Sequence, residues 1–247
     1  MKLPCRRLPD LRWRRSGVLL HPTSLPGPHG NGDLGVEAHR FLEFLTATGQ
    51  SWWQMLPIGP PGCAPAFSPY DSASAFAGSP WLVSLGLLAG EGLLTPGDLA
   101  PAPGLGSRRV RFAATLRFRE ARLRRAFATF RCRRGERRRD FLAFCDANAE
   151  WLEDFALFAA LRRDSGCKPW TDWAPEVRTR QPSALRAAAE RLADEVAAHR
   201  FVQFAFDRQW RALRKQARRL GTGLIGDLPF FVAHDSADVW CHQTLFK

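Results

Sequence analysis

The chain has 247 residues, of which 45% are hydrophobic and 24% are charged, and this content is sufficient for a sizeable core. Collagen-like, coiled-coil and wholly disordered classes are excluded, because nine Trp and 18 Phe side chains need a packed interior. The six cysteines are scattered without any CxxC pair, which predicts free thiols in a reducing compartment rather than a zinc ribbon or a thioredoxin motif.

The net charge of +12 at pH 7 arises in one segment. Residues 108–139 hold 14 arginines against Glu120 and Glu136, whereas the rest of the chain is neutral. Such a run is typical either of a solvated helix face in an arginine-rich sequence or of a surface for an acidic partner such as RNA. The segment has phenylalanines at core spacing and lacks an RNA-binding signature, so the solvated face is favoured and nucleic acid is not expected as a partner.

Export and membrane insertion are not expected. The apolar run behind the basic N-terminus is only Val18-Leu19-Leu20, which is too short for a secretory leader. Residues 72–90 lack charge, but they contain Pro80 and several Gly and Ser residues. A membrane-spanning helix there would leave polar groups without hydrogen bonds in lipid. These features predict a cytoplasmic protein without membrane contact.

The N-terminal quarter predicts a strand–helix–strand unit. Residues 1–16 are basic and aperiodic, and residues 17–20 form a short apolar run that predicts a buried strand. The proline-rich residues 21–28 can continue neither a strand nor a helix. Apolar spacing predicts a helix over 33–48, and a second apolar run predicts a strand over 52–58. This order predicts parallel strand pairing.

A long helical stretch follows before any further strand. Apolar residues recur at helical spacing over 110–130, 140–163 and 183–220, the last of these allowing a break in two. Residues 223–231 predict the third strand. Three parallel strands cannot close a barrel, and the outer edge of such a sheet is left unpaired.

These features divide the chain into four parts. They are a mobile basic extension (1–16), two strands with the first helix (17–60), a loop with an inserted helical subdomain and a further helix (61–220), and the third strand with its continuation (221–247).

Four long segments carry a family resemblance. These are GVLLHPTSLPGPHGNGDLG, SWWQMLPIGP, FSPYDSASAFAGSPWLVSL and GLIGDLPFFVAHDSADVW. Over about residues 17–246 the chain resembles the amylomaltases, the 4-α-glucanotransferases (disproportionating enzymes) of the α-amylase clan. The resemblance implies an α/β fold in which this chain is the N-terminal half. It would be an incomplete (β/α)8 TIM barrel, with its first three strands and a large, mainly helical insertion between strands 2 and 3.

The resemblance implies a reaction as well as a fold. Amylomaltases transfer α-1,4-glucan segments between maltooligosaccharides or to glucose by retaining double displacement, which needs two carboxyl groups. The family takes its nucleophilic Asp, acid/base Glu and stabilising Asp from later strands, beyond Lys247, so this chain is not expected to be active alone. The family needs no organic cofactor, and the six histidines lack metal-ligand spacing.

Four residues are predicted to bind substrate. Tyr70, the only tyrosine, and Ser68 lie in a Ser-Pro-Tyr loop, which the resemblance places at the sugar. An aromatic face suits the C–H face of a pyranose, although Tyr70 could be an ordinary core aromatic with a bonded hydroxyl. Asp227 follows the third strand, where barrel sites gather, and could instead be a turn residue before a proline. His234 is the weakest candidate, and its neighbours Asp235 and Ser236 could cap a helix.

Two departures and two alternatives accompany this interpretation. Asp71 stands where the family usually has Gln or Ser, and Ala66-Phe67 stands where it often has Gly-Asp, so contacts at the donor site are expected to differ at these positions. His21 is expected to brace its loop rather than touch sugar. The alternatives are a non-catalytic module, which binds glucan or an acidic partner through residues 108–139, and an oligomer that pairs the open sheet edges; the sequence does not fix the oligomeric state.

Overall fold

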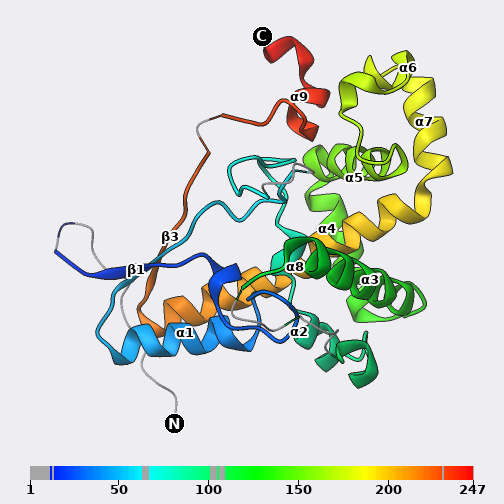
Figure 1. The fold of residues 1–247 in the computed structure, drawn as a ribbon. Helices are drawn as coiled ribbons and strands as arrows, with labels where there is room; N and C mark the ends of the chain where they lie inside the picture. The colour runs from blue at the N-terminus through cyan, green and yellow to red at the C-terminus, as the bar shows by residue number, and fades with distance from the viewer. Residues whose placement is uncertain are drawn as a thin grey trace. The chain divides into compact units, whose positions relative to one another are not determined.

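The computed structural model describes Arg12 and residues 14–62, 67–100, 105, 109–229 and 231–246. The chain forms two compact units, each assembled from segments that are distant in the sequence (Figure 1). Unit 1 comprises Met1–Ile58, Pro80–Arg131 and Ala205–Leu228, and unit 2 comprises Gly59–Ser79, Cys132–Phe204 and Pro229–Lys247. Apart from Arg12 and residues 14–16, the extension predicted for residues 1–16 lies outside the described residues, and the four-part division of the chain stays a prediction.

Unit 1 contains a three-stranded parallel sheet in the order β1-β2-β3. The strands are β1 (Gly17–Leu19), β2 (Trp52–Gln54) and β3 (Gly223–Ile225), and α1 (Val36–Ala47) connects the first two. The parallel strand–helix–strand unit expected from the sequence is therefore confirmed. β2 and β3 are shorter than the predicted strands 52–58 and 223–231, each of which includes a proline, Pro57 or Pro229, that cannot donate to a ladder.

The sheet register aligns the central residues of the three strands. Val18 pairs with Trp53, and Trp53 pairs with Leu224. Trp53 is fully buried, and its indole Nε1 donates a hydrogen bond to the carbonyl of Leu20 at 2.7 Å. Its ring also meets Phe41 of α1 edge-on at 4.9 Å between centroids, so one side chain joins the sheet to the covering helix.

The rest of unit 1 is helical. It contains the 3-10 helices η1 (Pro22–Ser24), η2 (Pro80–Leu82) and η3 (Pro96–Leu99), the α-helices α2 (Leu85–Gly90) and α3 (Phe112–Arg131), and the second part of α8 (Ala193–Leu220). The prediction of a helix over 110–130 is confirmed by α3. That helix buries Phe118, Phe127 and Phe130, as the core spacing indicated.

Unit 2 is built from helices and loops. Its helices are α4 (Glu136–Ala147), α5 (Ala149–Asp164), η4 (Trp170–Asp172), α6 (Pro175–Arg178), α7 (Pro182–Arg191), the first part of α8, α9 (Ala237–Cys241) and η5 (Gln243–Leu245). The single helix predicted over 140–163 is interrupted at Asn148, whose side-chain amide donates to the carbonyl of Phe144 at 2.7 Å. The break expected within 183–220 occurs at Leu192.

The core of unit 2 is an aromatic cluster around α9. Trp240 is fully buried, and its ring centroid lies 5.6 Å from that of Trp173 and 5.9 Å from that of Phe158. The indole Nε1 of Trp240 donates to the carbonyl of Val177 at 3.1 Å, so its one polar atom is satisfied. A five-residue helix is thereby held in place by packing rather than by its own length. Among the described helices of both units, none is long and apolar enough to cross a bilayer.

Candidate functional site

The Ser-Pro-Tyr loop of unit 2 is a tight turn held by its own serine. The Oγ of Ser68 accepts a hydrogen bond from the backbone N–H of Tyr70 at 3.3 Å. The backbone carbonyl of Ser68 accepts from the N–H of Asp71 at 3.2 Å. Tyr70 is half-buried. The turn therefore fixes the backbone from which the only tyrosine projects.

The base of this loop is braced by a second serine. Pro61 and Ser72 form an antiparallel bridge, and the N–H of Gly62 donates to the carbonyl of Asp71 at 2.7 Å. The buried hydroxyl of Ser72 lies within hydrogen-bond distance of two carbonyl oxygens, 3.0 Å from that of Pro60 and 2.7 Å from that of Ser74. Hydrogen bonds between side chains and the backbone, rather than a longer β-ladder, hold this loop in place.

Backbone strain lies next to the Ser-Pro-Tyr turn. Phe67 has φ +46°, in the left-handed region that bulky side chains rarely adopt. The family that this chain resembles often has Gly-Asp at positions 66–67. Both Gly and Asp tolerate a positive φ better than Phe does. Ala66 itself lies outside the described residues. The departure noted in the sequence thus coincides with a strained residue two positions before the turn's proline.

Asp227 belongs to unit 1 and follows β3 by two residues. It is half-buried, and it lies at the carboxyl end of the parallel sheet. At the same end, the loop after β1 is held by His21, whose Nδ1 lies 2.6 Å from the Oγ1 of Thr23 and whose Nε2 lies 3.3 Å from the carbonyl of Pro57. Burial lowers the pKa of His21, which keeps the imidazole neutral at pH 7. The expectation that His21 braces its loop is confirmed.

His234 lies in unit 2 just before α9. Its side chain is exposed, and its ring stacks on that of Trp170 at 5.4 Å between centroids. Its backbone carbonyl accepts from the Nε1 of Trp170 at 2.8 Å. The next residue, Asp235, forms an ion pair with Arg162 at 2.6 Å, and Ser236 caps α9 by accepting from a backbone N–H. Of the two cap candidates, Ser236 is the one that fills the role.

The structure distributes the four predicted residues over both units. Ser68 and Tyr70 lie together in one turn of unit 2, and His234 lies elsewhere in that unit, against Trp170. Asp227 belongs to unit 1. In the described parts of the chain, no group of three or more His, Cys, Asp or Glu side chains is placed to hold a metal ion.

With this geometry in hand, comparison with known proteins decides the family. The profile of the 4-alpha-glucanotransferase family matches residues 20–247. The chain belongs to this family. The resemblance drawn from the four motifs is therefore confirmed, and the matched range agrees with the one estimated from the residues.

Similar proteins include bacterial 4-alpha-glucanotransferases. One from Thermus thermophilus is 47% identical over 234 residues, which cover 94% of this chain and 46% of that protein. One from Synechocystis sp. is 43% identical, with the same two shares. An amylomaltase from Streptococcus agalactiae, solved in complex with acarbose, matches with a TM-score of 0.88 and 35% identity over 95% of this chain and 47% of that one. The chain thus spans about half the length of these family members.

One feature of unit 2 was not found from the sequence. A cavity of about 340 Å³ is lined by side chains from the loop after Tyr70, from α5 and from the α9 region, among them Phe76, Trp151 and Asp238. None of the four predicted site residues lines it. The two aromatic residues are 75 positions apart, so periodicity could not pair them; the only local signal is a Phe within the small-residue run SASAFAGS.

Proposed function

We propose that this chain forms the N-terminal, glucan-binding half of a 4-α-glucanotransferase of the amylomaltase type. The protein would transfer α-1,4-glucan segments between maltooligosaccharides or to glucose. The observation that carries the proposal is the match of residues 20–247 to the family, with the Ser-Pro-Tyr loop held as a rigid turn. The scattered thiols, of which Cys132, Cys145, Cys167 and Cys241 are free, support a cytoplasmic location.

The proposed architecture is an incomplete (β/α)8 barrel. The order β1-β2-β3 of parallel neighbours, with α1 crossing between the first two, supports this assignment. The helices of unit 2 that precede β3 in the chain, from α4 to the first part of α8, would then belong to an insertion between the second and third strands. Since barrel sites form at the carboxyl ends of strands, Asp227 is suitably placed for substrate contact.

Each predicted residue has a physical role in this proposal. Tyr70 would cover the C–H face of a pyranose at the scissile bond, and Ser68 both orders the turn and lies beside the sugar. Asp227, as a carboxylate, would accept hydrogen bonds from sugar hydroxyls. His234, stacked on Trp170, would add a polar contact at the rim. Ionised acceptors make stronger hydrogen bonds than neutral ones, so Asp227 should contribute most.

The covalent chemistry requires groups that this chain is not proposed to supply. In retaining double displacement one carboxylate attacks the anomeric carbon, and a second carboxyl protonates the leaving oxygen and then deprotonates the acceptor hydroxyl. We place both, and the third stabilising Asp, in the half of the family that this chain does not span. The 247-residue chain alone should therefore bind glucan without turning it over.

A chimera tests this proposal. The chain joined to the remaining half of the Thermus thermophilus relative should release glucose from maltotriose, whereas the chain alone should not. In the chimera, Asp227→Asn should lower kcat/KM by about 10- to 100-fold, because a charge-assisted hydrogen bond is lost. Asp207→Asn is the matched control, since Asp207 pairs with Arg211 on the surface of α8. A folded chimera without activity, or equal effects of the two substitutions, would contradict the proposal.

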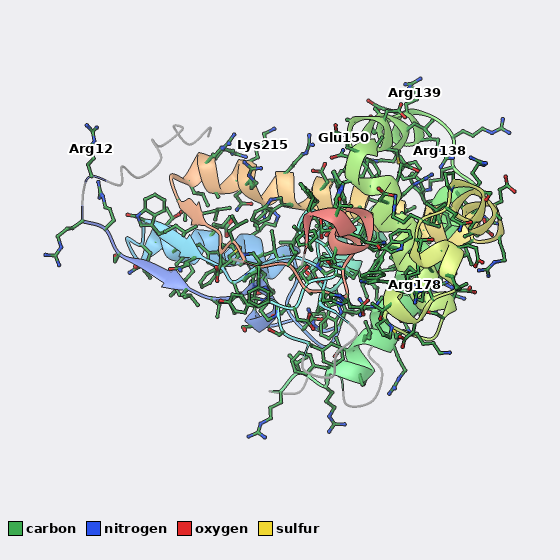
Figure 2. All side chains as sticks on the ribbon, turned by 90° about the horizontal axis from the view of Figure 1, so that it is seen from above. Arg12, Arg138, Arg139, Glu150, Arg178 and Lys215 are labelled. Atoms are coloured by element: carbon green, nitrogen blue, oxygen red, sulfur yellow. The ribbon has the colours of Figure 1, made fainter. Side chains whose placement is uncertain are left out.

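A second candidate function is binding of an acidic partner such as RNA. The specific observation is that five arginines of residues 133–139, all in unit 2, lie in the loop before α4 or in its first turn, and that all except the half-buried Arg138 are exposed; Figure 2 shows Arg139 pointing away from that helix. Phosphate binding by such a cluster must weaken steeply with added salt. Absence of binding to a random RNA at low salt would exclude it.

A further inference from the structure

We propose that the cavity of unit 2 between the residue 74–76 loop, α5 and α9 is a second binding site for α-1,4-glucan. The inference rests on the proposed function, because it assumes that glucan is the ligand class. The cavity measures about 340 Å³, within the size range of small-molecule sites. Its lining comprises Ser74, Phe76, Glu150, Trp151, Asp154, Phe155, Ala237, Asp238, Cys241 and His242.

An exposed aromatic platform forms one side of the site. The side chain of Phe76 is 67% exposed although it is large and apolar. Its ring stacks on that of Trp151, with 6.4 Å between centroids and 20° between planes. The Nε1 of Trp151 donates to the Oδ1 of Asn148 at 3.2 Å, which fixes the indole orientation. Such a flat surface matches the C–H face of a pyranose, which leaves water on contact.

Carboxylates beside the platform supply acceptors for sugar hydroxyls. Asp238 accepts from the N–H of Ala75 through Oδ2 at 2.9 Å, and Asp154 accepts from Arg180 through Oδ1 at 2.6 Å. A carboxylate has about four acceptor positions, so these bonds leave capacity for a ligand on both residues. The exposed Glu150, labelled in Figure 2, adds a third carboxylate to the same lining. Apolar surface combined with a few convergent polar groups is typical of ligand sites.

The loop that presents Phe76 is ordered before any ligand arrives. The Oγ of Ser74 accepts from the N–H of Phe76 at 3.1 Å and from the N–H of Ala77 at 3.2 Å. Gln203 of α8 then bonds both backbone groups of Gly78, at 2.7 Å and 2.9 Å. Because the loop loses little freedom on binding, more of the contact energy remains as affinity.

The chemistry of the lining favours a neutral polyol over other ligand classes. Three carboxylates repel phosphates and nucleic acids. Burial, with Asp154 next in effect, raises the pKa of Cys241 to about 12, so the thiol stays protonated and is not a nucleophile at neutral pH. An α-glucan has hydroxyls for the carboxylates and C–H faces for the aromatic pair. The remaining competing ligand class is a cationic amine, which would pair with the carboxylates. Unlike a glucan, it has no sugar ring to stack on Phe76 and Trp151.

Nuclear magnetic resonance of the full 247-residue chain tests the site directly. The indole N–H signal of Trp151 is identified by its loss in Trp151→Phe, and maltotriose is then titrated into the 15N-labelled chain. We expect a saturable shift of that signal. Phe76→Ala should weaken the affinity read from it by roughly two- to tenfold. Phe44→Ala is the matched control, because Phe44 is also an exposed phenylalanine, 55% exposed, stacked on another ring in α1.

The outcomes separate this inference from the proposed function. A Trp151 signal that does not move, or equal affinities of the Phe76 and Phe44 variants, overturns the second site. Sugar-dependent shifts at other indoles alone also overturn it, while the chimera assay still decides transferase activity. A response to spermidine without one to maltotriose overturns it in favour of a cation site. A Trp151 shift that persists in Tyr70→Ala, which removes the aromatic face of the first site, and weakens in Phe76→Ala supports it.

Discussion

The ion pair between Arg162 and Asp235 offers a sharp test of what stabilises unit 2 near His234. The Nη2 of Arg162 lies 2.6 Å from the Oδ2 of Asp235, and the two side chains are 10% and 27% exposed. Asp235 also accepts from the N–H of Trp170 through Oδ1 at 3.2 Å. One carboxylate thus ties α5 to the segment before α9. We consider Arg162→Met, Asp235→Asn and the double variant.

The magnitudes follow from the two exposures. Removing one partner of a fully buried pair costs about 3–5 kcal/mol. Asp235 is partly solvated, so after Arg162→Met water can replace the guanidinium, and we expect a loss of about 1–2 kcal/mol. Asp235→Asn leaves the guanidinium of Arg162 buried without its counter-charge, and we expect about 2–3 kcal/mol. The double variant should cost less than the sum, with a coupling of about 1–2 kcal/mol.

Urea unfolding, followed by tryptophan fluorescence, measures these differences as shifts of the midpoint at constant slope. The control is the exposed pair Arg211–Asp207, spaced i,i+4 on α8 with 71% and 28% exposure. Its coupling should be only about 0.3–0.5 kcal/mol. If the losses from Arg162→Met and Asp235→Asn simply add, the pair does not stabilise unit 2 and the reasoning from burial is refuted.

Three further measurements test separate features. Thr95, through its backbone N–H and hydroxyl, holds the pKa of Asp98 at about 2. The stability that this carboxylate contributes should therefore be complete above pH 3.8 and be lost as pH falls toward 2. Asp98→Asn should remove this pH dependence of the free energy of unfolding in acid titrations. Trp240→Phe should lower the free energy of unfolding by about 1–3 kcal/mol through a lost hydrogen bond and a cavity; an unchanged urea midpoint would contradict this. Cys241, with its raised pKa, should be alkylated at pH 8 more than tenfold slower than the exposed Cys132; equal rates, read by peptide mass mapping, would contradict that pKa.

The parts of the fold that the sequence predicted are those governed by local pattern. Two short apolar runs and the helix between them predicted the parallel pairing of β1 and β2, because period and turn chemistry are local properties. The phenylalanine spacing of α3 predicted its buried face for the same reason. The predicted strands 52–58 and 223–231 were too long, and each includes a proline that cannot donate to a ladder.

Charged residues show where local pattern fails. Arg119 lies within the arginine-rich run that the sequence assigned to a solvated face, yet it is 2% exposed. Its Nη2 donates to the carbonyl of Val83 at 2.5 Å and lies 3.4 Å from the Oδ2 of Asp33, and burial lowers its pKa. Neither partner is near it in the chain. One arginine among 14 became a buried link through tertiary contacts that no window of sequence contains.

The candidate site residues were predicted from motifs, not from the periodicity that predicted the helices and strands. The motifs that carry the family resemblance are mostly loops, and their order comes from particular side chains bonded to backbone: His21 after β1, Ser68 and Ser72 around the tyrosine turn, Ser74 below Phe76, and Ser236 at the start of α9. A helix face accepts many apolar residues, but a hydroxyl that holds a named N–H accepts few replacements. Loops of this kind therefore appear in a sequence as long motifs that tolerate few substitutions. The helices appear only as a periodic recurrence of apolar residues. That difference explains why four motif segments identified the family, while the stacking of Phe76 on Trp151 required the folded chain.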